Sequence, residues 1–131
     1  MLEKFYIGLK AMETELCEAM QKDLGRDMFI NYFMEISFME ASLKHEFNNA
    51  KKWMSDHPEE VELVHAPATA FSRYEPLGVV AVIGSWNAPI VTTLKPLMQA
   101  ITAGNCVIVK PSEMSPHSSA AIKKLTDKYL D

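Results

Sequence analysis

The chain has 131 residues, of which 48% are hydrophobic and 23% charged, and its formal net charge is −4. This length and balance are typical of one globular domain with a hydrophobic core. A mildly acidic chain without a basic stripe is not suited to nucleic acid, because it cannot neutralise a run of phosphates. The longest apolar run, residues 79–83, is far shorter than the ~20 residues of a membrane-spanning helix.

The two cysteines, Cys17 and Cys106, stand far apart, and none of the four histidines has metal-ligand spacing. This pattern gives neither a disulfide framework nor a metal site, and it is typical of a reducing compartment. Charges at Glu3 and Lys4 interrupt the apolar run that a secretory signal peptide needs. We therefore expect a cytoplasmic protein with no metal and no membrane segment in this chain.

The amino-terminal part of the chain carries two stripes of apolar residues at helical spacing. The first spans residues 2–24, and Gly25 is a natural helix terminator. The second spans residues 28–54 and is closed by Pro58, because the residue before a proline disfavours helical backbone. We expect the two helices to pack as an antiparallel pair with their apolar stripes in the core. The second stripe consists of Phe29, Phe33, Ile36, Met39, Leu43, Phe47, Ala50 and Met54.

After residue 60 the pattern changes to that of β-strands. Residues 61–64 and 71–75 read as two strands, and the segment around residues 66–68 reads as the loop between them. The sequence therefore predicts a β-hairpin in this region.

The remaining sequence predicts a strand, a helix, a second strand and a second helix. Residues 78–84 form a short β-branched run between glycines, which is typical of a strand buried on both faces of a parallel sheet. Residues 89–103 are expected to be a helix that Pro96 kinks or splits. A second buried strand follows at residues 106–109, and the Ser-Pro pair at residues 115–116 is a strong helix start with serine as the cap.

These elements predict an α/β fold with a helical segment at residues 1–57, a hairpin at 58–77 and a βαβα unit at 78–131. Open parallel sheets bind ligands outside the carboxyl ends of their strands. Those ends are residues 84–87 and 110–113, which are therefore the two candidate site segments.

Both segments resemble motifs of the aldehyde dehydrogenase superfamily. Residues 75–80, followed by residues 86–89, are similar to the family's E-P-x-G-V-V and W-N-[FY]-P stretch. Residues 100–105, followed by residues 109–113, are similar to its A-L-A-x-G-N and V-x-K-P-S-E stretch. The resemblance implies that the βαβα unit is part of a Rossmann-like NAD-binding domain.

Further segments look like the class-3 (fatty-aldehyde) branch of this superfamily, namely residues 23–26, 51–54 and 83–87. The resemblance covers essentially the whole chain, which is identified as the amino-terminal part of such an enzyme. Ala88 is a departure, because the family has an aromatic residue there, and the change bears on the local packing and the shape of the substrate funnel.

The resemblance implies a catalytic role for Asn87. Its side-chain amide would donate to the oxyanion that forms when a thiolate attacks the aldehyde carbonyl. From the residues alone, the favoured role of an asparagine at this position is a cap for the following helix or a bond within its own turn.

The resemblance also implies that Lys110 and Glu113 hold the adenine-ribose hydroxyls of NAD or NADP. A lysine offers donors and a carboxylate offers acceptors, so the two together suit a diol. Glu113 would repel a 2′-phosphate, which favours NAD without excluding NADP. From the residues alone, this segment is an ordinary strand-to-helix loop with exposed charges. Further cofactor contacts are implied for Ile83, Ser85, Trp86 and Ser112.

The activity implied by the resemblance is NAD(P)-dependent oxidation of an aldehyde to a carboxylic acid by a longer, homo-oligomeric enzyme. Its nucleophilic cysteine, general-base glutamate and catalytic domain have no match in this chain. Cys106 opens a predicted buried strand, and the glutamates around Cys17 should raise the pKa of its thiol, so neither is expected to be the nucleophile. We expect the chain alone to be inactive. The alternative hypothesis is a separate, non-catalytic binding or interaction module.

Overall fold

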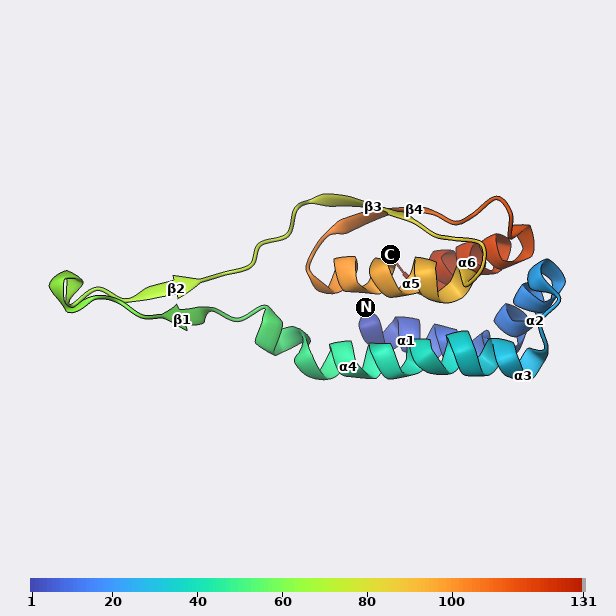
Figure 1. Ribbon diagram of the computed structural model, residues 1–131, viewed down its shortest axis with the longest axis horizontal. Helices are drawn as coiled ribbons and strands as arrows, with labels where there is room; N and C mark the ends of the chain where they lie inside the picture. The colour runs from blue at the N-terminus through green and yellow to red at the C-terminus, as the bar shows by residue number, and fades with distance from the viewer. Residues whose placement is uncertain (131) are drawn as a thin grey trace.

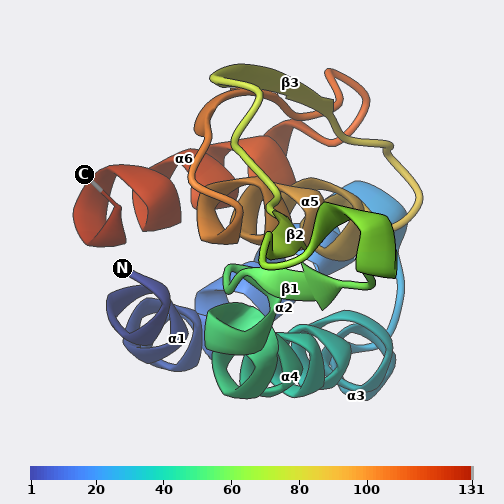
Figure 2. The ribbon, with the colours of Figure 1, turned by 90° about the vertical axis from the view of Figure 1, so that its left-hand side faces the viewer.

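The computed structural model describes residues 1–130, and its main body consists of three layers (Figures 1 and 2). A two-stranded parallel sheet, β3 (Val79–Ile83) and β4 (Cys106–Lys110), lies on the outside. Beneath it lie α5 (Pro89–Thr102) and α6 (Pro116–Tyr129), and beneath these lie the amino-terminal helices. A thin hairpin arm projects from one end of the body (Figure 1).

The two predicted amino-terminal helices are present as an antiparallel pair, and each is divided. The first is broken at Met12 into α1 (Leu2–Ala11) and α2 (Glu13–Leu24), and α2 ends at Gly25, whose φ of 67° suits glycine. The second consists of α3 (Met28–Asn31), a π-helical turn (Tyr32–Ile36) and α4 (Ser37–Trp53).

Only the middle of the predicted second stripe lies in the core. Ile36, Met39 and Leu43 are buried as expected. The prediction was wrong for the aromatic members and for Met54, because Phe29, Phe33, Phe47 and Met54 are exposed. A π-helical turn holds one more residue than an α-helical turn, so Phe29 and Phe33 do not share the face of Met39 and Leu43. Glu35 occupies an inward-facing position of that turn instead.

The predicted hairpin exists, but its first strand lies elsewhere. β1 (His57–Glu59) pairs antiparallel with β2 (Ala70–Ser72). Residues 61–64 do not form a strand, and Leu63–His65 make a 3-10 turn instead. The apolar side chains of this segment do not contact the core, and the side chain of Leu63 is 91% exposed. The apolar pattern of residues 61–64 therefore suggested buried side chains, but the arm has no core in which to bury them.

The predicted parallel strand pair is confirmed, in register from Val79↔Cys106 to Ile83↔Lys110. The prediction that both faces are buried was wrong. Helix α5 covers the inner face, while Ile83, Ile108 and Cys106 on the strands are exposed. Within residues 1–130 no element packs on the outer face.

Helix α5 continues without a break through Pro96, so the expected split does not occur. A proline inside a helix costs about 3 kcal/mol. Each fully buried leucine or methionine contributes about 1.5–3 kcal/mol. The buried face of α5 carries several such residues and therefore offsets the cost of the proline. They are Ile90, Leu94, Leu97 and Met98.

None of the helices within residues 1–130 is both long and apolar enough to cross a membrane. The same residues contain no group of three or more His, Cys, Asp or Glu side chains that could hold a metal ion.

Candidate functional site

The structure brings the two predicted site segments together at one edge of the sheet. Ile83 and Lys110 are paired at the carboxyl ends of β3 and β4, and the N–H of Gly84 donates to the carbonyl of Lys110 at 2.9 Å. The loop after β3 (residues 84–88) and the loop after β4 (residues 111–115) therefore start side by side. This is the place where open parallel sheets bind ligands.

Asn87 lies exposed in the loop after β3. Its Oδ1 accepts a hydrogen bond from Ser85 Oγ at 2.8 Å. Ala88 occupies the cap position of α5, and no side chain of the loop caps the helix. Asn87 therefore uses its oxygen within its own turn, which leaves the Nδ2 donor outside this contact.

The loop after β3 is fastened to the first turns of α5. The N–H of Ser85 donates to Thr92 Oγ1 at 3.0 Å, and that hydroxyl donates to the carbonyl of Ala88 at 2.9 Å. Gly84 packs so closely on Thr93 that a Cβ at this position would lie 2.0 Å from Thr93 Oγ1. Only glycine fits there without a shift of Thr93, so the loop and α5 are in close contact.

Glu35 accepts the first free N–H groups of α5. Its Oε2 accepts hydrogen bonds from the N–H of Ile90 at 2.8 Å and of Val91 at 3.2 Å. Its Oε1 accepts from the guanidinium of Arg26, and the Glu35 side chain is only 1% exposed. The sequence alone did not single out Glu35. The available signal was an acidic residue within an apolar helix, next to the stripe residue Ile36.

Asp23 accepts the first free N–H groups of α6. Its two carboxylate oxygens accept from the N–H of His117 at 3.1 Å and of Ser118 at 2.7 Å. Ser115 is the N-cap residue of α6 and Pro116 its first residue, as predicted, but the Ser115 hydroxyl donates to the carbonyl of Ser112 at 3.3 Å and accepts from no N–H group of the helix. Carboxylates from the amino-terminal helices thus occupy the N-termini of both helices that follow the site loops.

Lys110 and Glu113 form an ion pair at the surface, with 2.7 Å between Nζ and Oε2. Their side chains are 61% and 79% exposed, so a ligand can reach both. The hydrogen bond from Lys110 lowers the pKa of Glu113. At neutral pH the loop therefore presents one donor and one acceptor next to each other.

The other predicted cofactor contacts have different surroundings. Ser112 is buried, and its Oγ accepts from the N–H of Met114 at 3.2 Å, so its hydroxyl already supports the turn. Ile83 and Trp86 are exposed beside Asn87 in the chain. Their cofactor roles stay predictions.

Neither thiol lies at the site. Cys106 pairs with Val79 at the amino ends of the strands, four residues and about 13 Å along β4 from Lys110. Its thiol is exposed, contrary to the expectation of a buried cysteine. Cys17 is buried, and burial, with the charges of Glu13 and Glu35, raises its thiol pKa to about 11. The predicted raised pKa is confirmed, with burial as its main cause.

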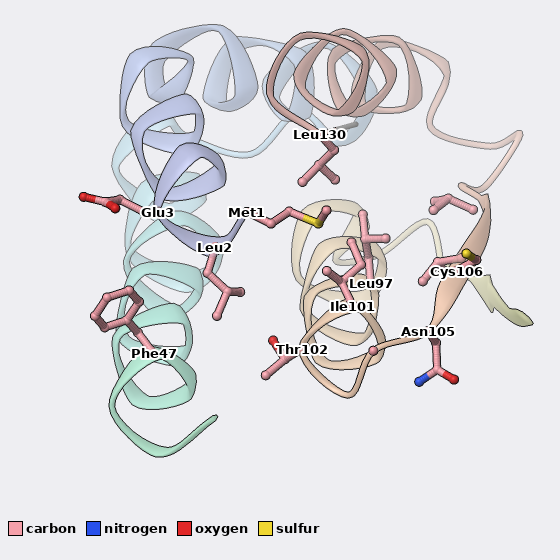
Figure 3. Close-up of a pocket in the computed structure, with 13 residues that line it drawn as sticks. Met1, Leu2, Glu3, Phe47, Leu97, Ile101, Thr102, Asn105, Cys106 and Leu130 are labelled. Atoms are coloured by element: carbon pink, nitrogen blue, oxygen red, sulfur yellow. The ribbon is translucent and has the colours of Figure 1, made fainter. Parts of the chain in front are cut away.

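A cavity of about 810 Å³ opens at the opposite end of the sheet from Asn87 (Figure 3). It lies between the start of α1, the end of α5 and the start of β4, and mainly apolar side chains line it. Labelled examples are Leu2, Phe47, Leu97, Ile101 and Leu130. It therefore does not extend the candidate site.

Comparison with known proteins gives one consistent result. A family model described as "Aldehyde dehydrogenase family" matches residues 1–129. Aldehyde dehydrogenase family 3 member H1 of Arabidopsis thaliana is 39% identical over 130 residues, which are 99% of this chain and 27% of that protein. Family 3 member B3 of Mus musculus is 38% identical over 123 residues, 94% of this chain and 26% of that protein. The chain thus spans about a quarter of the length of these relatives.

Solved structures agree with the sequence matches. The substrate-bound state of Staphylococcus aureus AldH superposes with a TM-score of 0.96 at 32% identity, over 99% of this chain and 28% of that one. A succinic semialdehyde dehydrogenase from Streptococcus pyogenes, in complex with NADP+, superposes with a TM-score of 0.85 at 18% identity, over 99% of this chain and 28% of that one. The latter likeness shows the fold alone. The predicted α/β fold class and the predicted family resemblance are both confirmed.

Proposed function

Because the chain belongs to the aldehyde dehydrogenase family, we propose that its residues serve the NAD(P)-dependent oxidation of aldehydes to carboxylic acids. The observation that carries this proposal is the meeting of two polar loops at one sheet edge. One loop holds Asn87, and the other holds the Lys110–Glu113 pair. Residues 1–131 then form part of an NAD(P)-binding domain.

Lys110 and Glu113 fit the ribose diol of a nicotinamide cofactor. The exposed ammonium donates to one hydroxyl and the carboxylate accepts from the other. The bound cofactor supplies a hydride acceptor for the oxidation of the substrate. A 2′-phosphate would lie against the Glu113 carboxylate, whose lowered pKa keeps it ionised, so the pair favours NAD.

Asn87 is the oxyanion donor in this proposal. Ser85 donates to its Oδ1, which restrains the side-chain amide and leaves Nδ2 outside this hydrogen bond. A single positioned donor of this kind lowers the barrier by about 3–4 kcal/mol. The donor acts on charge that develops on the aldehyde oxygen, so its main effect is on the transition state.

The nucleophilic thiol and the general base come from outside these 131 residues in this proposal. Cys106 lies at the wrong end of the strand, and the raised pKa of Cys17 keeps its buried thiol protonated. The complete enzyme is then a longer homo-oligomeric protein that acts on an aldehyde. The chain alone does not turn over aldehyde.

Ligand-observed NMR with NAD and with AMP tests the ribose site in the 131-residue chain. We expect weak saturation transfer from the protein to the adenosine protons, and its loss in the Lys110→Ala and Glu113→Ala variants. Lys123→Ala is a matched control, because Lys123 forms a similar exposed ion pair with Asp127 on α6, at 2.6 Å. An unchanged signal in both site variants would contradict the assignment, as would submicromolar NAD binding that both variants retain.

A further inference from the structure

Glu35 is a buried carboxylate that joins the amino-terminal helices to the site. It lies in the π-helical turn, 55 residues before its partner Ile90. We propose that Glu35 is a positioning residue, which holds the Asn87 loop in place through the first turn of α5. The role assigned to Asn87 rests on the proposed function, whereas the mechanical link from Glu35 to the loop does not.

The first link is the N-terminus of α5. The first N–H groups of a helix have no partner within the helix and need an acceptor from elsewhere. Ala88 at the cap position has no side-chain acceptor, and Glu35 Oε2 takes this role for Ile90 and Val91. A negative charge is favoured at this end of the helix dipole. Arg26 balances the same carboxylate, so the buried charge is paired.

The second link runs from α5 to the loop. Thr92 directly follows the residues that Glu35 holds, and its hydroxyl accepts from the N–H of Ser85. Ser85 in turn donates to Asn87 Oδ1. Gly84 also packs against Thr93, so two consecutive residues of the loop contact the first turns of α5. A displacement of the first turn of α5 must therefore displace Ser85 and Asn87.

Asp23 provides a matched comparison within the same chain. It caps α6 with the same chemistry and two similar hydrogen bonds, but α6 follows the other loop. Loss of either cap removes stability. Only loss of the Glu35 cap should alter the surroundings of residues 84–88.

Tryptophan fluorescence can separate these two effects. Trp86 lies in the loop, and the chain has one other tryptophan, so a Trp53→Phe background leaves Trp86 as the single reporter. We expect Glu35→Gln to shift the Trp86 emission and its quenching by acrylamide in the folded chain, and Asp23→Asn to leave both unchanged. Glutamine has a single acceptor oxygen, whereas Glu35 uses one oxygen for Arg26 and the other for α5. In Glu35→Gln the amide protons of Ile90 and Val91 should therefore exchange about tenfold to a hundredfold faster.

Equal Trp86 signals in the Glu35→Gln and Asp23→Asn variants would overturn the proposal, since the effect would then be loss of stability alone. If Glu35→Gln does not fold, Glu35→Asp keeps the charge beside Arg26 and withdraws the oxygens from α5. It should produce the same shift, and an unchanged Trp86 signal would again overturn the proposal. No cofactor or aldehyde is present in these measurements, so a failed ribose-binding experiment leaves their outcome intact.

Discussion

Helix α5 and the hairpin arm both contain apolar residues, but these side chains have opposite environments. Residues of α5 pack against α4 on one side and the β3–β4 sheet on the other (Figure 1). Leu63 and Val64 at the tip of the arm contact no core residue. An apolar pattern thus indicates that a segment needs a partner, and only the fold decides whether this chain supplies it.

The largest expected effect comes from truncating a residue in the layer that is covered on both sides. Leu94 is fully buried, so Leu94→Ala should lower the free energy of unfolding by about 2–5 kcal/mol through lost burial and a cavity. The matched substitution Leu63→Ala in the arm should change it by less than about 0.5 kcal/mol. Urea denaturation followed by circular dichroism measures both. Equal losses would show that the arm is folded onto the body in solution.

The same contrast explains what the sequence could predict of the fold. The apolar stripe of α5, which includes Ile90 and Leu94, was correctly predicted to be buried, because the elements that cover it lie within the chain. The strands were placed correctly, but their burial was overestimated, since the outer face exposes Ile83 and Ile108. The first strand of the hairpin was predicted at residues 61–64, but β1 lies a few residues earlier. The alternating pattern indicates which side chains are apolar, and it does not indicate which residues pair with β2.

Some features of the candidate site could likewise be predicted from the sequence, and others could not. Chain order and strand ends sufficed to place the starts of the two site loops at one edge of the sheet, because parallel strands end at the same edge. Glu35 and Asp23 escaped prediction because their partners are backbone N–H groups 55 and 94 residues further along the chain. No local pattern carries that information, since any residue can present an N–H group.

The next largest expected effect is the difference in reactivity between the buried thiol of Cys17 and the exposed thiol of Cys106. The pKa of Cys17 is raised from 9.0 to about 11, so at pH 8 its thiolate fraction falls about a hundredfold. Cys106 is exposed. Iodoacetamide labelling of the folded chain, read by peptide mass spectrometry, should therefore modify Cys106 at least about a hundredfold faster. In urea the two rates should converge, and similar rates in the folded chain would refute the burial of Cys17.

The smallest expected effect concerns Glu46, a second buried carboxylate, which bonds Ser42 and Gln99 and lies near Lys95. Burial raises its pKa above 4.5, so the folded chain binds this proton more tightly than the unfolded chain does. Its contribution to stability is therefore greatest below the unfolded pKa and is lost as the pH rises through the folded pKa. Glu46→Gln should keep the hydrogen bonds and remove this loss.

The stability of Glu46→Gln relative to the parent chain should therefore increase as the pH rises from 4 to 7, by about 1 kcal/mol or less. Glu60→Gln in the exposed arm makes the same change of charge and should show no such trend, because nothing buries that carboxylate. Urea denaturation of the three proteins at both pH values provides the measurement. A parallel trend in the two variants would mean that net charge, and not burial of Glu46, controls the pH dependence.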